Sequence, residues 1–365
     1  MFEPKFEITN NLLAYISSIE SAKAIIENSP LVPAWEAKFK KDAMARTVHF
    51  GTKIEGNDLT EEETKKVVRL ELVDDPEEAA KKTGITARER DVQEVINYRN
   101  VVRWIDEQDM RASAELFSEK TLKHLHALTM NRVLDEDKIG SYREQQVIVR
   151  GAGEHEGQVV FRPPVSVEVP YLIEEFVDWL SDAKSKQVHS IFRAAITHYQ
   201  LVFIHPFIEG NGRTARAMAT LVLYAGGYDF KRFFSIEEYF DRNVEGYYRA
   251  LQSVQQSEGQ DMTYWLEYFC YGLALEVERV KKQVLKLSKD LKMKEELGKQ
   301  VALSERQIII LELLQNQGQI TSSDAQEVLP NVSVDTILRD LKDLIKKGVV
   351  EKHGVTKGVT YSLQD

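Results

Sequence analysis

Apolar residues recur at helical spacing over most of the first 300 positions, and polar residues fill the positions between them. Val92, Val95 and Ile96, for example, lie near one face of a helix. Thr60 followed by Glu63 forms a capping box, which predicts a helix running towards residue 72. The same pattern predicts helices at 34–47, 86–104, 118–130, 167–180, 188–204, 213–225, 244–256 and 262–287. The predicted fold class is therefore mainly α.

One segment interrupts the helical pattern. Residues 146–149 and 159–161 are rich in β-branched and aromatic side chains, glycines stand between them, and Pro163 and Pro164 follow. This arrangement predicts a β-hairpin. An isolated hairpin is only marginally stable, so it must lean on the body of the protein or be completed by a partner strand.

The composition changes near residue 300. Residues 281–299 are rich in Lys, Glu and Leu and predict a long helix or helical linker. Beyond them the pattern predicts three helices at 304–315, 321–329 and 333–347, then two short strands at 349–354 and 359–363. Three helices and a hairpin resemble a winged helix-turn-helix.

The composition excludes several classes of protein. The chain is 43% hydrophobic and 29% charged, as in ordinary globular proteins. Its net charge of −10 argues against a general binder of polyanions, although a local basic site is compatible with it. One cysteine, Cys270, excludes an internal disulfide framework and a multi-cysteine zinc site. No run of 18 apolar residues and no basic signal sequence is present, so we expect a reduced cytoplasmic protein.

The densest chemical signal lies between residues 205 and 216. A predicted helix begins directly after the sequence Gly210, Asn211 and Gly212. The free backbone N–H groups and the dipole at the start of a helix attract anions. Arg213 and Arg216 are three positions apart, so both guanidinium groups can reach the same side of that helix. This part of the chain therefore predicts a phosphate-binding site.

Two further groups in the segment suggest a reaction. Glu209 is a hard oxygen ligand suited to Mg²⁺ beside phosphates. His205 titrates near neutral pH and is the natural general base. A phosphate cradle, a metal ligand, two cations and a base together indicate nucleotidyl or phosphoryl transfer.

The segment at 205–216 reads HPFIEGNGRTAR and resembles the HPFx(D/E)GNGRxxR motif of Fic domains at every defined position. The resemblance covers roughly residues 45–270. It implies a helical bundle with a β-hairpin flap, and an adenylyltransferase that moves AMP from ATP to a Ser, Thr or Tyr hydroxyl of a target protein.

The resemblance also implies roles for single residues. His205 would deprotonate the hydroxyl, and Glu209 would bind Mg²⁺ between the α and β phosphates. Backbone N–H groups around Gly210, Asn211 and Gly212 would hold phosphate oxygens. Arg213 would contact the phosphates and Arg216 the γ-phosphate.

Two more sets of residues resemble family features, each with a simpler explanation. Asn243, Tyr247 and Tyr248 resemble residues that line the adenine pocket, or they take part in ordinary helix packing. The predicted hairpin resembles the flap that docks the target, with Ile148, Val149, Val159 and Val160 as the docking residues, or it is a plain surface hairpin.

The segment at 51–57 resembles the family's inhibitory motif, (S/T)xxxE(G/N). Glu55 and Gly56 match, but Gly51 stands where the family has Ser or Thr, and Thr52 comes one residue late. The resemblance implies that Glu55 inhibits AMP transfer, and that the intact protein can also remove AMP. The simpler explanation is a helix that ends at a glycine cap.

These features divide the chain into an N-terminal helical region at 1–95, a catalytic core at 96–280, a helical linker at 281–302 and a winged-helix domain at 303–365. The last region has seven basic and nine acidic residues, so its net charge is −2. A DNA reader usually presents a basic face, and winged helices also dock proteins or form dimers. The alternative function is therefore a DNA-binding transcriptional regulator whose Fic-like part only senses a nucleotide.

Overall fold

The computed structural model describes residues 2–31, 33–70, 72–110, 116–150, 159–182, 185–295, 303–354 and 359–364. Helices predominate in these residues, and their strands form one two-stranded and one three-stranded antiparallel sheet. The predicted mainly α fold class is confirmed. The chain forms two compact units, Met1–Glu27 with Lys40–Lys281 and Asn28–Phe39 with Lys282–Asp365.

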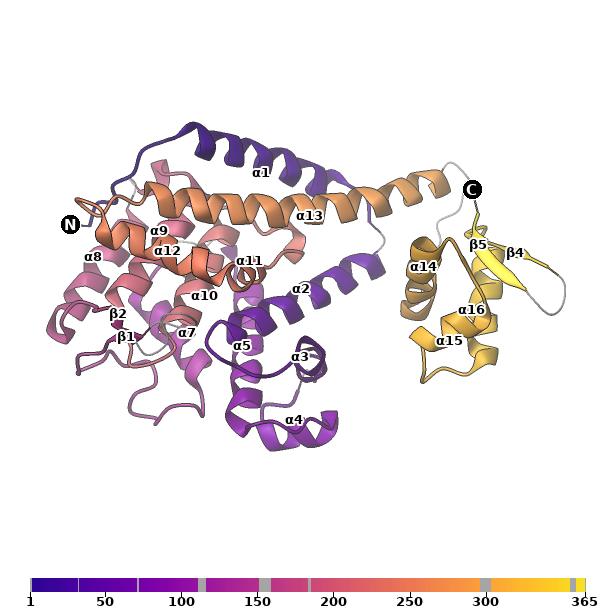
Figure 1. Ribbon diagram of the computed structural model, residues 1–365, viewed down its shortest axis with the longest axis horizontal. Helices are drawn as coiled ribbons and strands as arrows, with labels where there is room; N and C mark the ends of the chain where they lie inside the picture. Colours follow the sequence, from indigo (N-terminus) through magenta and orange to yellow (C-terminus); the bar gives the residue numbers. More distant parts are fainter. Residues whose placement is uncertain are drawn as a thin grey trace. The chain divides into compact units, whose positions relative to one another are not determined.

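The first unit consists mostly of helices (Figure 1). In chain order the helices that lie in it wholly or in part are α1 (Asn10–Asn28), α2 (Pro33–Lys53), α3 (Glu61–Val68), α4 (Pro76–Thr83), α5 (Glu89–Glu107), α7 (Glu119–Met130), α8 (Val169–Ser181), α9 (Ser190–Ile204), α10 (Asn211–Ala225), α11 (Ile236–Arg242), α12 (Val244–Gln256) and α13 (Thr263–Glu295). Every helix predicted for this part of the chain is present. The two that cross into the second unit, α2 and α13, continue past their predicted ends.

Three helices of the first unit were not predicted from the sequence. α11 has only seven residues, too few for a periodicity to emerge. α4 has almost no apolar face and is defined by its ends, where Asp75 caps the first turn and Gly84 closes the last in a left-handed conformation. α1 lies alongside the first part of α13 (Figure 1), where the Thr9 hydroxyl donates to a Glu267 carboxylate oxygen at 2.5 Å.

The core of the first unit is built around α9 and α10, which pack closely against each other. Residues 191–201 of α9 are all buried, as expected for a helix surrounded by other elements. Trp265 of α13 is fully buried and donates its indole N–H to the Ala195 carbonyl at 2.7 Å. α5 and α7 pack against α10. The loop between α9 and α10, residues 205–210, is therefore held at both ends by buried helices.

The predicted hairpin is present as β1 (Val149–Arg150) and β2 (Val159–Phe161), which pair antiparallel. The first strand lies later than predicted, since only Val149 of residues 146–149 belongs to it. Val149 pairs with Phe161 and Arg150 with Val159, with an irregularity between the two pairs. The glycine-rich tip predicted between the strands lies outside the described residues.

The second unit contains the predicted winged helix-turn-helix. Its elements are α14 (Glu305–Gln317), β3 (Gln319–Ile320), α15 (Ser322–Val328), α16 (Val334–Lys346), β4 (Val350–His353) and β5 (Thr360–Leu363), with the strand order β3-β5-β4. Ser304 and Thr321 cap α14 and α15 in capping boxes, and Ser333 caps α16. The two-residue strand β3 was not predicted, because its length carries no pattern.

The second unit has a hydrophobic core of its own, formed by α14, α15, α16 and the sheet. Trp35, at the start of α2, packs with Leu287 and Ile308 in a smaller cluster of the same unit. No helix in the described part of the chain combines the length and the apolar character needed to cross a membrane.

Candidate active site

The loop from 205 to 210 turns sharply between two buried helices. His205 ends α9 with φ 51° and ψ 60°, the left-handed conformation, while its backbone N–H donates to the Leu201 carbonyl at 3.0 Å. Gly210 precedes α10 with φ 76°. A side chain at position 210 would also collide with the Met130 sulfur, so the turn requires glycine there.

Asn211 and Phe207 hold this loop closed. The Asn211 side chain accepts the Phe207 backbone N–H at 2.9 Å and donates to the Phe207 carbonyl at 2.8 Å. The Phe207 ring is fully buried and stacks on His126, with the ring centres 3.7 Å apart. The Asn211 side chain is thus committed to the loop, and only its backbone is left to take part in the predicted phosphate cradle.

His126 fixes the position of Glu209. Its Nδ1 accepts the Gly140 backbone N–H at 2.9 Å, so the neutral ring carries its proton on Nε2 and donates it to the Glu209 carbonyl at 3.1 Å. Burial, together with the nearby Arg213 charge, lowers the pKa of His126 to about 4.

Arg143 joins the loop to the hairpin. Its Nε donates to the His205 carbonyl at 2.7 Å, and its Nη2 donates to the Pro164 carbonyl at 2.5 Å. Its backbone N–H donates to the Pro206 carbonyl at 2.9 Å. Arg143 therefore ties the segment that follows β2 to the backbone of the candidate base.

The His205 ring is arranged to accept a proton. Its Nδ1 lies 3.2 Å from the Val202 carbonyl, which can only accept, so Nδ1 carries the proton and Nε2 is free to act as a base. Burial lowers the pKa of His205 below its ordinary value of 6.5, against smaller opposing effects of Val202 and Glu55. The imidazole is therefore neutral at pH 7.

Glu55 and Arg216 form an ion pair next to the first turn of α10. The Glu55 Oε1 lies 2.8 Å from the Arg216 Nη2, which also donates to the Gly51 carbonyl at 2.8 Å. Burial acts to raise the pKa of Glu55, but Arg216 and Arg213 outweigh it, so the carboxyl stays ionised. A side chain at Gly212 would collide with the Glu55 Oε1, which shows how closely Glu55 lies against α10.

The structure explains why position 51 is glycine. A Cβ there would collide with the Tyr98 ring of α5, so Gly51 allows the end of α2 to lie directly on that ring. Thr52 is buried and donates its hydroxyl to the Val48 carbonyl at 2.9 Å and the His49 carbonyl at 3.1 Å within its own helix. Thr52 thus has no contact with the Glu55 side chain among the hydrogen bonds described.

A pocket of about 640 Å³, open to solvent, brings several of these residues together. It is lined by Ile54, Glu55, Val149, Phe161, Val202, His205, Gly212, Arg216, Tyr247, Tyr248, Leu251, Gln252 and Gln255. Asn243, between α11 and α12, is exposed and is not part of this lining. The Tyr247 hydroxyl lies 3.1 Å from the His198 Nε2, so its polar end is already bonded within the core.

The hairpin residues are divided between the pocket and the surface. Val149 lines the pocket, whereas Ile148 and Val159 are 36% and 41% exposed. Val160 belongs to β2. The strands therefore stand at the edge of the pocket that contains His205.

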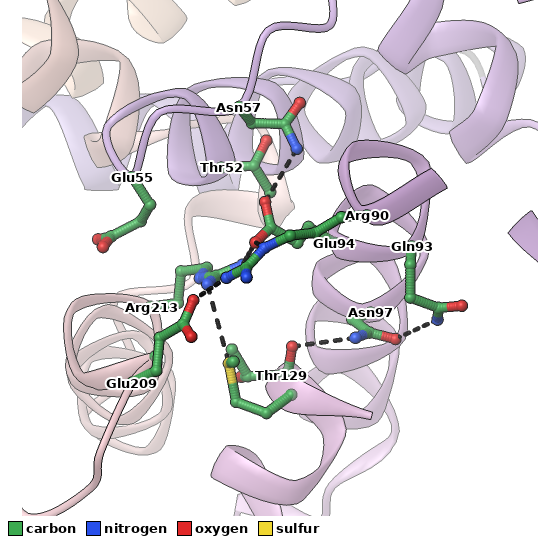
Figure 2. A network of polar contacts seen from close by, with 12 residues as sticks. Thr52, Glu55, Asn57, Arg90, Gln93, Glu94, Asn97, Thr129, Glu209 and Arg213 are labelled. Atoms are coloured by element: carbon green, nitrogen blue, oxygen red, sulfur yellow. Dashed lines mark hydrogen bonds and ion pairs between the residues drawn. The ribbon is translucent and has the colours of Figure 1, made fainter. Parts of the chain in front are cut away.

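Arg213, Glu94, Arg90 and Glu209 form a polar network beside the pocket (Figure 2). The Arg213 Nη1 lies 3.3 Å from the Glu94 Oε1, and the Arg90 Nε lies 3.2 Å from the same oxygen. The Arg90 Nη2 also pairs with the Glu209 carboxylate. Among the described residues, no group of three or more His, Cys, Asp or Glu side chains is close enough to hold a metal ion.

The long-range contacts of Arg143, Tyr98, Glu94 and Arg90 were not predicted. All four residues lie within the range that resembles the family, but these partners are distant in sequence, and no local spacing connects them. The pairing of Arg90 with Glu209 spans 119 positions and could be found only from the fold.

The comparisons with known proteins agree with the motif and the fold. The model of the Fic/DOC family matches residues 116–223, and that of the DeoR-like helix-turn-helix domain matches residues 306–356. A protein adenylyltransferase Fic of Drosophila willistoni is 28% identical over 216 residues, 58% of this chain and 38% of that protein. Its counterpart in Drosophila grimshawi is 31% identical over 192 residues, 52% of this chain and 35% of that protein. The match thus spans less than half the length of these relatives.

Solved structures extend the similarity of fold to nearly the whole chain. A Fic family protein from Desulfovibrio desulfuricans G20 superposes with a TM-score of 0.64 at 23% identity, over 99% of this chain and 98% of that chain. Fic-1 (residues 134–508) from C. elegans gives a TM-score of 0.55 at 21% identity, over 76% and 73% of the two chains. This chain therefore has the Fic fold and carries a Fic/DOC domain followed by a C-terminal DeoR-like helix-turn-helix domain.

Proposed function

We propose that this protein is a protein adenylyltransferase, which transfers AMP from ATP to a Ser, Thr or Tyr hydroxyl of a target protein. The observation that carries the proposal is the pocket in which a neutral His205 lies with Arg216 and the first turn of α10. Curated relatives at about 30% identity are named protein adenylyltransferase Fic, which supports the same reaction.

In the proposed reaction the target hydroxyl oxygen attacks the α-phosphorus of ATP. The bond between the α-phosphorus and the oxygen that bridges to the β-phosphate breaks, and pyrophosphate leaves. The hydroxyl proton passes to the Nε2 of His205, which the Val202 contact leaves without a proton. The products are the AMP ester of the target and pyrophosphate.

The two arginines of the motif would bind the phosphates. The Nε atoms of Arg213 and Arg216 are buried and have no hydrogen-bond partner among the described residues, so both side chains retain donors for an anion. Backbone N–H groups in the first turn of α10 add further donors, and the helix dipole favours negative charge at that end.

Glu209 fits a magnesium ligand. Mg²⁺ usually keeps several waters and binds through one or two carboxylates together with substrate phosphates, so one carboxylate beside a phosphate cradle suffices. Glu209 is 38% exposed and lies directly before α10. When bound, the ion would offset the negative charge of the phosphates.

Glu55 would inhibit this reaction. Its carboxylate is paired with Arg216, the side chain that we assign to the γ-phosphate, and lies against Gly212 at the phosphate cradle. ATP would then bind with its α-phosphate displaced, and a small displacement is enough to prevent in-line attack. The same glutamate would assist removal of AMP from a modified target.

The hairpin would dock the target. β1 and β2 stand beside His205, and an extended target segment could add its backbone hydrogen bonds to the free strand edge, placing the hydroxyl near the base.

The test is incubation of the full chain and its Glu55→Gly variant with radiolabelled ATP, Mg²⁺ and a cell lysate. We expect label from the α-phosphate, but not from the γ-phosphate, on one or a few proteins. His205→Ala should abolish this label while ATP binding remains. Label arriving from the γ-phosphate would mean a different transferred group, and no label from either would contradict transferase activity.

A specific feature of α16 supports DNA binding as a second candidate function. Asp340 is buried and pairs with Arg306 at 2.7 Å, and the half-exposed Asp343 pairs with Lys347 at 2.5 Å, so each acid has a cationic partner in its own domain. The exposed face presents Arg339, Lys342 and Lys346, with Asp335 at its beginning.

This distribution of charge is more favourable for DNA than the net charge of the region indicates, because Asp340 and Asp343 are paired with cations of the domain and the exposed face carries three cations and one acid. A winged helix with such a face could place α16 in the major groove. Footprinting of the full chain on its own promoter would test the candidate. Complete absence of protection at low salt would favour a docking or dimerising domain.

A further inference from the structure

Glu94 connects the inhibitory turn to the residues beside the phosphate cradle. Its side chain is only 5% exposed, and both carboxylate oxygens are engaged. Oε2 accepts the side-chain N–H of Asn57 at 3.1 Å, two residues after Glu55. Oε1 faces Arg90 at 3.2 Å and Arg213 at 3.3 Å (Figure 2).

Arg90 continues the connection to the candidate metal ligand. Its Nε is held by Glu94, and its Nη2 pairs with the Glu209 carboxylate. Arg90 is 50% exposed, so its guanidinium can swing into solvent without leaving a buried cavity. The carboxylate that we assign to the metal is therefore paired with a half-exposed cation of the same chain.

We propose that Arg90 competes with the divalent metal for Glu209, and that the inhibitory turn strengthens this competition through Asn57 and Glu94. The inference rests on the proposed ATP and Mg²⁺ site. The Arg90 guanidinium occupies Oε1 of Glu209 and offsets the charge of the carboxylate, so a metal ion that uses this oxygen must displace Arg90. Glu94 opposes its departure, because it keeps the Arg90 Nε in place after the Nη2 is released.

The connection makes Glu94 a positioning residue. It has no contact with the loop at 205–210 among the hydrogen bonds described, and acts on Glu209 only through Arg90. Asn57 fixes the opposite side of Glu94 and also donates to the Asp91 carbonyl at 3.0 Å. The turn that carries Glu55 thus has two connections to the site. Glu55 itself pairs with Arg216, and Asn57 is linked through Glu94 and Arg90 to the Glu209 carboxylate.

The experiment measures ATP binding by calorimetry as a function of Mg²⁺ concentration. All variants are full-length and carry Glu55→Gly and His205→Ala, so that ATP can enter the site but is not consumed. Arg90→Gln should lower the Mg²⁺ concentration for half-maximal ATP binding by about two- to fivefold, the range expected when an exposed ion pair is removed. Arg132→Gln is the matched control, because it removes a surface arginine that pairs with Asp75 instead.

A double-variant comparison tests the role of Glu94. Glu94→Gln should lower the same Mg²⁺ midpoint, and should lower it less when Arg90→Gln is already present, since the part of its effect that passes through Arg90 is then gone and only its contact with Arg213 is left. An unchanged or raised midpoint in Arg90→Gln would overturn the inference. Weaker ATP binding by Arg90→Gln in the presence of EDTA would also overturn it, because Arg90 would then be a nucleotide ligand. If the background protein binds no ATP at any Mg²⁺ concentration, the proposed function itself fails.

Discussion

His205 adopts a backbone conformation that costs a non-glycine residue about 1–2 kcal/mol. The surrounding structure holds it there: Arg143 binds its carbonyl, and the Val202 carbonyl accepts its Nδ1 proton. Strain maintained by surrounding contacts is common at functional sites. In this protein it fixes the tautomer and the direction of the candidate base before any substrate arrives.

The pH dependence of AMP transfer tests the state of His205. Burial lowers the pKa of this base, so the free enzyme should keep a neutral imidazole as the pH falls through 6.5. The acid limb of the kcat/KM profile should therefore lie below pH 6.5, measured with labelled ATP and an identified target. A limb above pH 6.5 would mean that another group, or a protonated His205, controls the reaction.

His126 makes a prediction about stability. Because its pKa is about 4 in the folded protein and 6.5 in an unfolded chain, the unfolded state binds more protons between these values. Because of this group, the free energy of unfolding should fall by about 2 kcal/mol between pH 7 and pH 5, and should return as the pH rises again.

Thermal unfolding at the two pH values measures this loss. His126→Gln can keep both hydrogen bonds of the ring without titrating, and should show a smaller drop in Tm between pH 7 and pH 5 than the wild type. The exposed His124→Gln is the control and should behave like the wild type. An equal drop in all three proteins would show that other histidines dominate the acid sensitivity.

At the scale of elements, α2 and the turn after it bring Glu55 to α10. Gly51 lets the helix lie on Tyr98, Gly56 turns the chain with φ 88°, and Asn57 anchors the turn to α5. These three residues act through shape and hydrogen bonding. In the proposed inhibition, the carboxylate that pairs with Arg216 is that of Glu55.

Glu55→Gly is therefore expected to raise AMP transfer, including self-modification, well above the wild-type rate at saturating Mg²⁺-ATP. The substitution removes the carboxylate from Arg216 and leaves the anchors of the turn in place. The variant that also carries His205→Ala should show no gain. Equal rates for wild type and Glu55→Gly would reduce Glu55 to the end of a helix capped by Gly56.

The same elements show what the sequence could and could not predict. The motif at 205–216 was recognised because its chemistry is contiguous, and most helices were predicted because their apolar residues are periodic. Arg143, His126 and Glu94 each have at least one hydrogen-bond partner more than 30 positions away, which no local pattern contains. The glycine at position 51 departed from the family motif, and only the Tyr98 ring lying against it supplies the reason.

At the scale of the whole molecule, the two compact units have separate hydrophobic cores. The pocket with His205 belongs to the first unit, and the exposed cations of α16 belong to the second. Substitutions on the exposed face of α16 should therefore leave the pocket with His205 intact. This separation allows the two candidate functions to be tested independently in one full-length protein.

If α16 reads DNA, the variant that carries Arg339→Gln and Lys342→Gln should bind promoter DNA more weakly. Its plot of log affinity against log salt should be shallower by about 2, because each phosphate that the protein no longer neutralises removes about 0.9 from the slope. Label transfer from ATP should be unchanged, since both side chains are exposed and lie outside the core of their unit.

The control for a general change in charge is Lys82→Gln, which alters an exposed lysine of the first unit that pairs with Glu78. An unchanged salt slope in the double variant would exclude this face of α16 as the DNA-binding surface, and a parallel fall in AMP transfer would contradict the independence of the two units.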